Sequence, residues 1–270
     1  MPSRNIKCMP FGLPDRSRRG VLTVLGCTIL ACATPVHTMA ADLRTIVPAV
    51  KRSVVGVGTF ERTRSPSTVF VGTGFVVGDG LDIITNAHVI PTLSADGIEQ
   101  LGIVLPEGEG VRFRAAELVA RDNEHDLAHL RISGTPLPAL ELGDSDTAQE
   151  GQELALTGFP LAMALGLHAA THRATLAAIT PIVRPSLGAR NLDPRQIAAL
   201  QRAPFSIFQL DGTAYPGNSG SPVYDPATGK VLGVINAVFV KGLKETAITA
   251  PSGITYAVPS NYVRDLLRRK

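Results

Sequence analysis

The sequence predicts an all-β fold, a barrel or a sandwich, and three observations support this. From residue 41 onward, short apolar runs rich in Val, Ile and Leu alternate with turn-forming residues. Such runs are typical of many short strands rather than of a parallel sheet covered by helices. The chain contains 26 Gly and 20 Pro among 270 residues, so breaks between strands are frequent. No internal repeat of fixed period is visible, which disfavours a solenoid or a propeller.

The predicted elements follow from these runs in chain order. The strands expected in the first half are 54–60, 69–77, 83–85, 103–105, 111–120 and 127–132. Those expected in the second half are 153–157, 205–210, 231–238 and 254–258. Gly78-Asp79-Gly80 predicts a hairpin turn. Helices are expected only at 42–52 and 260–268, with Ser260 as the N-cap of the second.

Two segments lack strand patterns, and we interpret one as a linker and the other as a loop. Residues 137–151 are the candidate linker between two halves, which we place at 41–148 and 149–270. Residues 184–204 are irregular and interrupted by Pro and Gly. We interpret them as a long surface loop, a kind of segment that is often functional.

The N-terminal segment 1–40 predicts a signal peptide. Arg18-Arg19 precedes a mostly apolar run at 21–33, which is short for a membrane span but suits a signal peptide. Thr38-Met39-Ala40 offers a cleavage site, so we expect an exported protein, periplasmic or secreted. A twin-arginine or a general export route, a lipid anchor at Cys32 and an uncleaved anchor helix stay open as alternatives.

Charge and cysteine content exclude several classes of protein. The net charge of +3 arises in residues 1–40, and the remainder carries 21 basic and 22 acidic residues. A nucleic-acid-binding surface is therefore not expected. Cys8, Cys27 and Cys32 all lie in the leader. The mature chain then has no disulfide, no thiol nucleophile and no cysteine-bound zinc.

Ser219 is the candidate nucleophile. It lies in the glycine-flanked turn 215–222, and a hydroxyl nucleophile needs an exposed position with backbone N–H groups nearby. The five histidines of the mature chain all precede it, which contradicts the Ser–acid–His order of α/β-hydrolases. These histidines are His88, His125, His129, His168 and His172. The order His–Asp–Ser remains.

The motifs at 85–89 (Thr-Asn-Ala-His-Val), 126–130 (Asp-Leu-Ala-x-Leu) and 217–222 (Gly-Asn-Ser-Gly-Ser-Pro) make the pattern specific. In order and spacing they resemble the catalytic blocks of trypsin-like serine proteases of the HtrA (DegP) group. Further matching blocks are 72–77, 142–145 and 256–261, so the likeness spans roughly residues 45–262.

The resemblance implies two six-stranded antiparallel β-barrels of the chymotrypsin type, with a short C-terminal helix. His88 would be the general base, Asp126 would orient it, and Ser219 would attack a peptide bond. The backbone N–H groups of Gly217 and Ser219 would form the oxyanion hole. Protein or peptide substrates are expected, with no metal or other cofactor, and a homo-oligomer stays open.

Other aspartate and histidine residues allow two alternative assignments, a different triad acid and a zinc site. Asp122 is an alternative triad acid, although it is more typical of a turn. His168 and His172 have the i, i+4 spacing of zinc ligands on a helix, but no acid lies between them.

The primary substrate pocket is expected to involve Thr213 and Ala214 at its floor and Ile235, Asn236 and Ala237 along one wall. None of these is acidic, so a small apolar residue rather than Lys or Arg is the expected preference. PDZ domains follow the protease in the HtrA group and no such domain is recognised up to Lys270, so we expect a stand-alone protease domain. A latent protease-like binding or chaperone module of the cell envelope is the alternative function.

Overall fold

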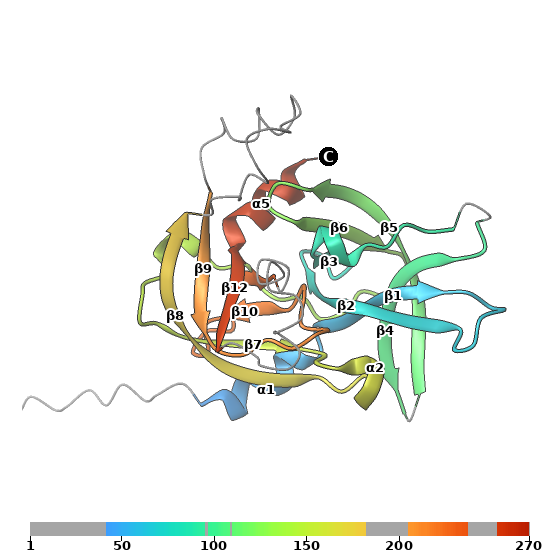
Figure 1. The fold of residues 1–270 in the computed structure, drawn as a ribbon, viewed down its shortest axis with the longest axis horizontal. Coiled ribbons are helices and arrows are strands. Elements are labelled where there is room, and N and C mark those ends of the chain that lie inside the picture. Colours follow the sequence, from blue (N-terminus) through green and yellow to red (C-terminus); the bar gives the residue numbers. More distant parts are fainter. Residues whose placement is uncertain (1–41, 95–96, 109, 182–204, 237–252, 270) are drawn as a thin grey trace, which may run out of the picture. The chain divides into compact units, whose positions relative to one another are not determined.

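The computed structural model describes residues 42–94, 97–108, 110–181, 205–236 and 253–269. Twelve strands dominate these ranges and form two closed antiparallel barrels (Figure 1). The predicted all-β fold with two six-stranded barrels is confirmed. Among the described helices, none has the length and hydropathy that crossing a membrane requires.

The first barrel has the strand order β1-β2-β3-β6-β5-β4. Its strands are β1 (Val54–Phe60), β2 (Thr68–Val77), β3 (Asp82–Thr85), β4 (Gln100–Glu107), β5 (Gly110–Asp122) and β6 (Leu127–Ile132). The predicted hairpin joins β2 to β3, and Gly78 and Gly80 there have φ values of 63° and 87°. Glycine adopts this left-handed region without the steric cost that other residues meet.

The second barrel has the order β10-β11-β12-β9-β8-β7. Its strands are β7 (Glu153–Gly158), β8 (Ala170–Pro181), β9 (Ser206–Asp211), β10 (Pro222–Tyr224), β11 (Val231–Ile235) and β12 (Ile254–Pro259). The strand-by-strand prediction lacked β8 and β10. β8 is rich in Ala and Thr and therefore carries a weak hydrophobic signal, and β10 has only three residues and starts with Pro.

Short helical segments flank the barrels. They are α1 (Leu43–Lys51), η1 (Ala87–Val89), η2 (Ser145–Thr147), α2 (Ala162–Leu165) and α5 (Ser260–Arg268). The prediction that Ser260 caps α5 is wrong. The N-cap residue is Pro259, and the Ser260 hydroxyl instead donates to the Gly143 carbonyl at 2.8 Å, so it ties the helix to the segment between the barrels.

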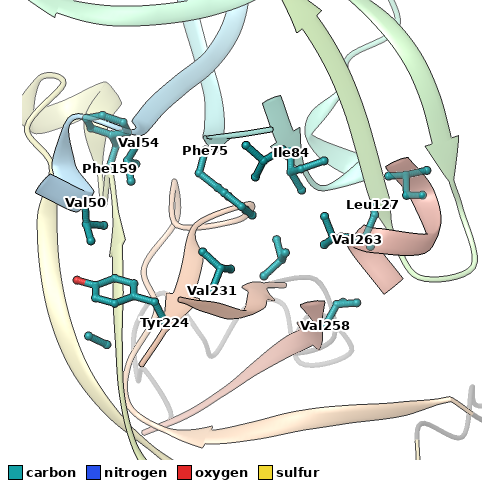
Figure 2. Close-up of a cluster of buried hydrophobic side chains, with 14 of the residues drawn as sticks. Val50, Val54, Phe75, Ile84, Leu127, Phe159, Tyr224, Val231, Val258 and Val263 are labelled. Carbon is teal, nitrogen blue, oxygen red and sulfur yellow. The ribbon is translucent and has the colours of Figure 1, made fainter. Parts of the chain in front are cut away.

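Three clusters of buried apolar side chains stabilise this arrangement. One fills the first barrel and includes Val57, and another fills the second barrel and includes Leu210. The third draws on both barrels, α1 and α5. Figure 2 shows Phe75 and Leu127 of the first barrel in this shared cluster with Val258 of the second. Because buried apolar area is the main source of stability, the shared cluster holds the two barrels together.

The predicted linker 137–151 lies between β6 and β7. Leu142 pairs with Val231 of the second barrel, whereas the Leu140 N–H donates to the Val76 carbonyl of the first at 2.8 Å. The segment therefore contacts both barrels. The long loop expected at 184–204 lies outside the described residues.

Candidate active site

His88 and Asp126 meet at one end of the first barrel. β3 and β6 are antiparallel neighbours with Thr85 opposite Ala128, so residues that follow β3 lie beside residues that precede β6. His88 lies in η1 after β3, and Asp126 lies directly before β6. His88 Nδ1 is 2.5 Å from Asp126 Oδ2, and the His88 backbone N–H donates to Oδ1 at 2.8 Å.

Asp126 has a strained backbone that its neighbours hold in place. Its φ is 54°, a left-handed conformation that costs a residue other than glycine about 1–3 kcal/mol. Its carbonyl accepts hydrogen bonds from the Ala87 N–H at 3.1 Å and from Asn86 Nδ2 at 3.0 Å. Asn236 Nδ2 donates to the carboxylate at 2.8 Å. These contacts fix the carboxylate toward His88.

The turn that carries Ser219 joins β9 to β10. The Pro216 carbonyl accepts a hydrogen bond from the Leu161 N–H at 2.7 Å, and because the peptide unit is planar and trans, the Gly217 N–H points the opposite way. Gly217 has a φ of 101°, and a Cβ there would lie 2.3 Å from the Phe159 carbonyl oxygen. Within the described ranges, the N–H groups of Gly217 and Ser219 donate to no protein acceptor.

Thr73 of β2 fastens this turn to the first barrel. Its backbone N–H donates to the Ser219 carbonyl at 2.9 Å. Its hydroxyl donates to the Gly217 carbonyl at 2.6 Å and accepts from the Phe159 N–H at 3.1 Å. Sequence reasoning assigned no role to Thr73, although the block 72–77 that contains it was part of the resemblance.

Gly72 allows the serine turn to approach the histidine turn. A Cβ on Gly72 would come within 2.8 Å of the Val89 side chain and 3.2 Å of the Ser219 carbonyl oxygen. Val89 follows His88 directly, so the Ser219 backbone lies close to the turn that carries His88. Among the hydrogen bonds of the described residues, none joins the Ser219 hydroxyl to His88.

The residues expected around the substrate pocket have different environments. Thr213 is half-buried, whereas Ala214 packs against the core of the second barrel. Ile235 is fully buried in the same core. The Asn236 side chain is also buried and turns its amide to Asp126. Ala237 lies outside the described residues.

The alternative acid Asp122 pairs with a different histidine. Asp122 Oδ2 lies 2.9 Å from His125 Nδ1 and 3.0 Å from the Arg269 guanidinium. Burial acts to raise the pKa of Asp122, but hydrogen bonds from His125 and the charge of Arg269 outweigh it, so its pKa lies below the usual value. No hydrogen bond of the described residues links Asp122 to His88.

His168 and His172 do not share a helix. α2 ends at Leu165, His168 lies in the following loop, and His172 lies in β8. Burial lowers the pKa of His172, because a desolvated imidazole favours its neutral form. In the part of the chain that the structure describes, no three metal-binding side chains gather.

Comparison with known proteins identifies the class. Residues 72–234 match the family model of the trypsin-like peptidase domain, which covers more than half of the chain. The chain therefore belongs to the trypsin-like peptidase family.

Its relatives within that family are serine proteases of the DegP and HtrA type. A "Probable periplasmic serine endoprotease DegP-like" of Halomonas elongata is 29% identical over 73% of this chain and 34% of its own length. The mitochondrial serine protease HTRA2 of Drosophila pseudoobscura pseudoobscura is 31% identical over 76% of this chain and 40% of its own length. The chain thus spans well under half the length of these relatives.

Solved structures show the same fold. The HtrA-type protease AlgW with a decapeptide matches at a TM-score of 0.59 and 23% identity, over 84% of this chain and 66% of that one. Deg5 matches at 0.58 and 24% identity, over 82% of this chain and 90% of that one. At this identity the likeness concerns the fold alone.

Proposed function

We propose that this protein is a serine endopeptidase that hydrolyses peptide bonds through an acyl-enzyme, with His88, Asp126 and Ser219 as its triad. The 2.5 Å contact between His88 Nδ1 and Asp126 Oδ2 carries the proposal. This contact lies at the end of the first barrel, where Thr73 of β2 forms hydrogen bonds with the turn that carries Ser219. The family membership and the DegP and HtrA relatives support the same reaction.

Each residue has a defined task in this mechanism. His88 Nε2 takes the proton of the Ser219 hydroxyl as its oxygen attacks the peptide carbonyl carbon, and Asp126 stabilises the imidazolium that forms. The N–H groups of Gly217 and Ser219 stabilise the oxyanion. His88 then protonates the leaving amine. In the second half of the reaction, water attacks the acyl-enzyme while His88 takes its proton, and His88 then returns that proton to the Ser219 oxygen.

The proposed substrates are unfolded or exposed segments of proteins in the cell envelope. Residues 1–40 would direct export, and relatives named as periplasmic endoproteases support that location. We place the primary pocket at Thr213, Ala214, Ile235, Asn236 and Ala237. Because Ile235 and Asn236 turn their side chains away into buried contacts, their backbone would form the wall, and the absence of an acid among the five disfavours Lys and Arg.

Degradation of reduced casein by the purified protein tests the proposal, with Ser219→Ala as the control. Cleavage by the wild type alone would establish both the activity and the nucleophile. Removing the nucleophile of such a triad lowers turnover on the order of 10⁶-fold. Cleavage by both proteins would contradict the assignment of Ser219.

A latent binding module is the second candidate. The observation that favours it is the missing hydrogen bond between the Ser219 hydroxyl and His88 among the described residues. A fluorophosphonate probe separates the two functions, because covalent capture of Ser219 requires a formed site. Labelling of the wild type but not of Ser219→Ala supports the peptidase, and no labelling of either supports the latent module.

A further inference from the structure

A second histidine–carboxylate pair, Asp122 and His125, lies four residues and one residue upstream of Asp126. The side chain of Asp122 is only 4% exposed. Its Oδ1 accepts the backbone N–H groups of Glu124 at 2.9 Å and His125 at 3.1 Å. Its Oδ2 contacts His125 Nδ1 at 2.9 Å. The carboxylate therefore holds both the backbone and the ring of His125.

Aromatic rings hold the same imidazole from the other sides. The Tyr262 ring stacks on His125 with centroids 4.0 Å apart and an interplanar angle of 19°. Phe205 meets it edge-on at 4.7 Å and 67°. Phe205 directly precedes β9 and Tyr262 lies in α5, so elements outside the first barrel fix a residue of its β5–β6 turn.

The helix that supplies Tyr262 is itself firmly anchored. Val263 and Leu266 on α5 are fully buried in the cluster shared by the barrels. Arg264 donates to the Leu142 carbonyl at 2.8 Å. Just beyond the helix, Arg269 forms the ion pair with Asp122 at 3.0 Å. The contact on His125 is thus part of a rigid attachment rather than of a free chain end.

His125 is the immediate neighbour of Asp126, whose left-handed backbone must be held from both sides. On the downstream side, Leu127 is fully buried at the start of β6. On the upstream side, the anchored group is His125. A shift of its ring and backbone would turn the shared peptide unit and move the Asp126 carboxylate relative to His88.

We propose that His125 is a positioning residue for Asp126, held by the Asp122 carboxylate and by the rings of Phe205 and Tyr262. Its contribution to turnover rests on the proposed peptidase function, but its effect on the His88–Asp126 contact does not. A purely structural role in attaching α5 would change stability and leave that contact unaltered.

The test is the variant His125→Ala in the full-length protein. Because misplacement by about 1 Å can cost on the order of 100-fold in rate, kcat for labelled casein should fall by about 10- to 100-fold while KM changes little. The low-field proton NMR signal of His88 Nδ1, expected for a 2.5 Å hydrogen bond, should shift or broaden. Since that signal needs no turnover, it reports on the geometry even if casein is not a substrate.

His129→Gln is the matched control. His129 Nε2 is 2.8 Å from Asp82 Oδ1, and its side chain is 9% exposed, so it is a comparable pair three residues downstream of Asp126. This variant should keep both kcat and the low-field signal. If His125→Ala fails to fold, His125→Phe keeps a stacked ring and the backbone hydrogen bond to Asp122 and loses only the contact between the imidazole and Asp122, with a smaller loss of kcat expected.

Unchanged kcat and an unchanged low-field signal in folded His125→Ala or His125→Phe would overturn the proposal. So would equal losses in His129→Gln, because the effect would then follow general destabilisation. Inactivity of the wild type together with an altered signal in His125→Ala would contradict the peptidase function but support the positioning role.

Discussion

Two aspartates four residues apart, Asp122 and Asp126, each pair with a histidine, and the surroundings of the two pairs differ. In the pair Asp126–His88 the side chains are 18% and 25% exposed, and the serine turn lies alongside. In the pair Asp122–His125 they are 4% and 13% exposed, and aromatic rings and Arg269 enclose them. The same chemical pair is thus partly exposed beside the serine turn in one case and enclosed in the interior in the other, which fits the catalytic role that we propose for the first pair and the positioning role that we propose for the second.

Asp126→Asn should have the largest effect on activity. An amide cannot stabilise the His88 imidazolium or select its tautomer, so kcat should fall about 10⁴-fold with little loss of stability. Asp122→Asn should lower kcat by no more than about 100-fold. Casein cleavage rates and thermal melting of both variants check this, and the reverse ranking would make Asp122 the triad acid.

Asn236→Ala removes the contact that the second barrel makes with Asp126. It removes the donor at 2.8 Å from Asp126 Oδ2, and a hydrogen bond to a charged group contributes about 1.5–3 kcal/mol. We expect kcat to fall about 10-fold. Asn261→Ala is a suitable control, since Asn261 Nδ2 donates to Asp144 at 2.8 Å on the exposed surface, and equal losses in both variants would disprove a specific role.

The free energy of unfolding should depend on pH through the buried pair Asp122–His125. Because the pKa of Asp122 is lowered in the folded protein, its ionised form stabilises the fold above the unfolded pKa of about 3.9. That contribution is lost as the pH falls through the lowered value. Urea unfolding should show wild type about 1–2 kcal/mol more stable than Asp122→Asn near pH 7.

The difference between these two proteins should start to shrink below about pH 4, where Asp122 of the unfolded protein takes up its proton, and should vanish once the pH falls below the lowered pKa of the folded protein. A difference that stays constant from pH 7 to pH 3 would mean that the carboxylate charge does not stabilise the fold.

The pair His129–Asp82 should give the smallest effect. It lies on β6 and β3 beside Arg131, which contacts Asp82 at 2.6 Å, so one ion pair remains after His129→Gln. We expect a loss of about 1 kcal/mol in the free energy of unfolding and no change in kcat. A loss of activity beyond threefold would contradict this expectation, because loss of activity would then follow general destabilisation rather than the contacts that hold Asp126.

The prediction of individual strands succeeded where apolar residues were dense and failed where they were sparse. β1, β2 and β6 contain runs of Val, Ile or Leu that a local pattern detects, whereas β8 reaches the core through Ala174 and Leu176 alone. Thr73 and Asn236 were beyond prediction as contacts of the site, because their partners lie 144 and 110 residues away in sequence.

The order of a histidine, an aspartate and a serine, the all-β class and the absence of cysteine from residues 41–270 could be read from the sequence, because they depend on residue type and spacing. The choice between Asp122 and Asp126 as the partner of His88 depended on the folded chain, since both aspartates lie near the start of β6. The tertiary structure also turned the Asn236 side chain from the expected pocket wall toward Asp126. These outcomes depend on strand neighbours and barrel contacts, which the pairing of β3 with β6 and the attachment of α5 create only in the folded chain.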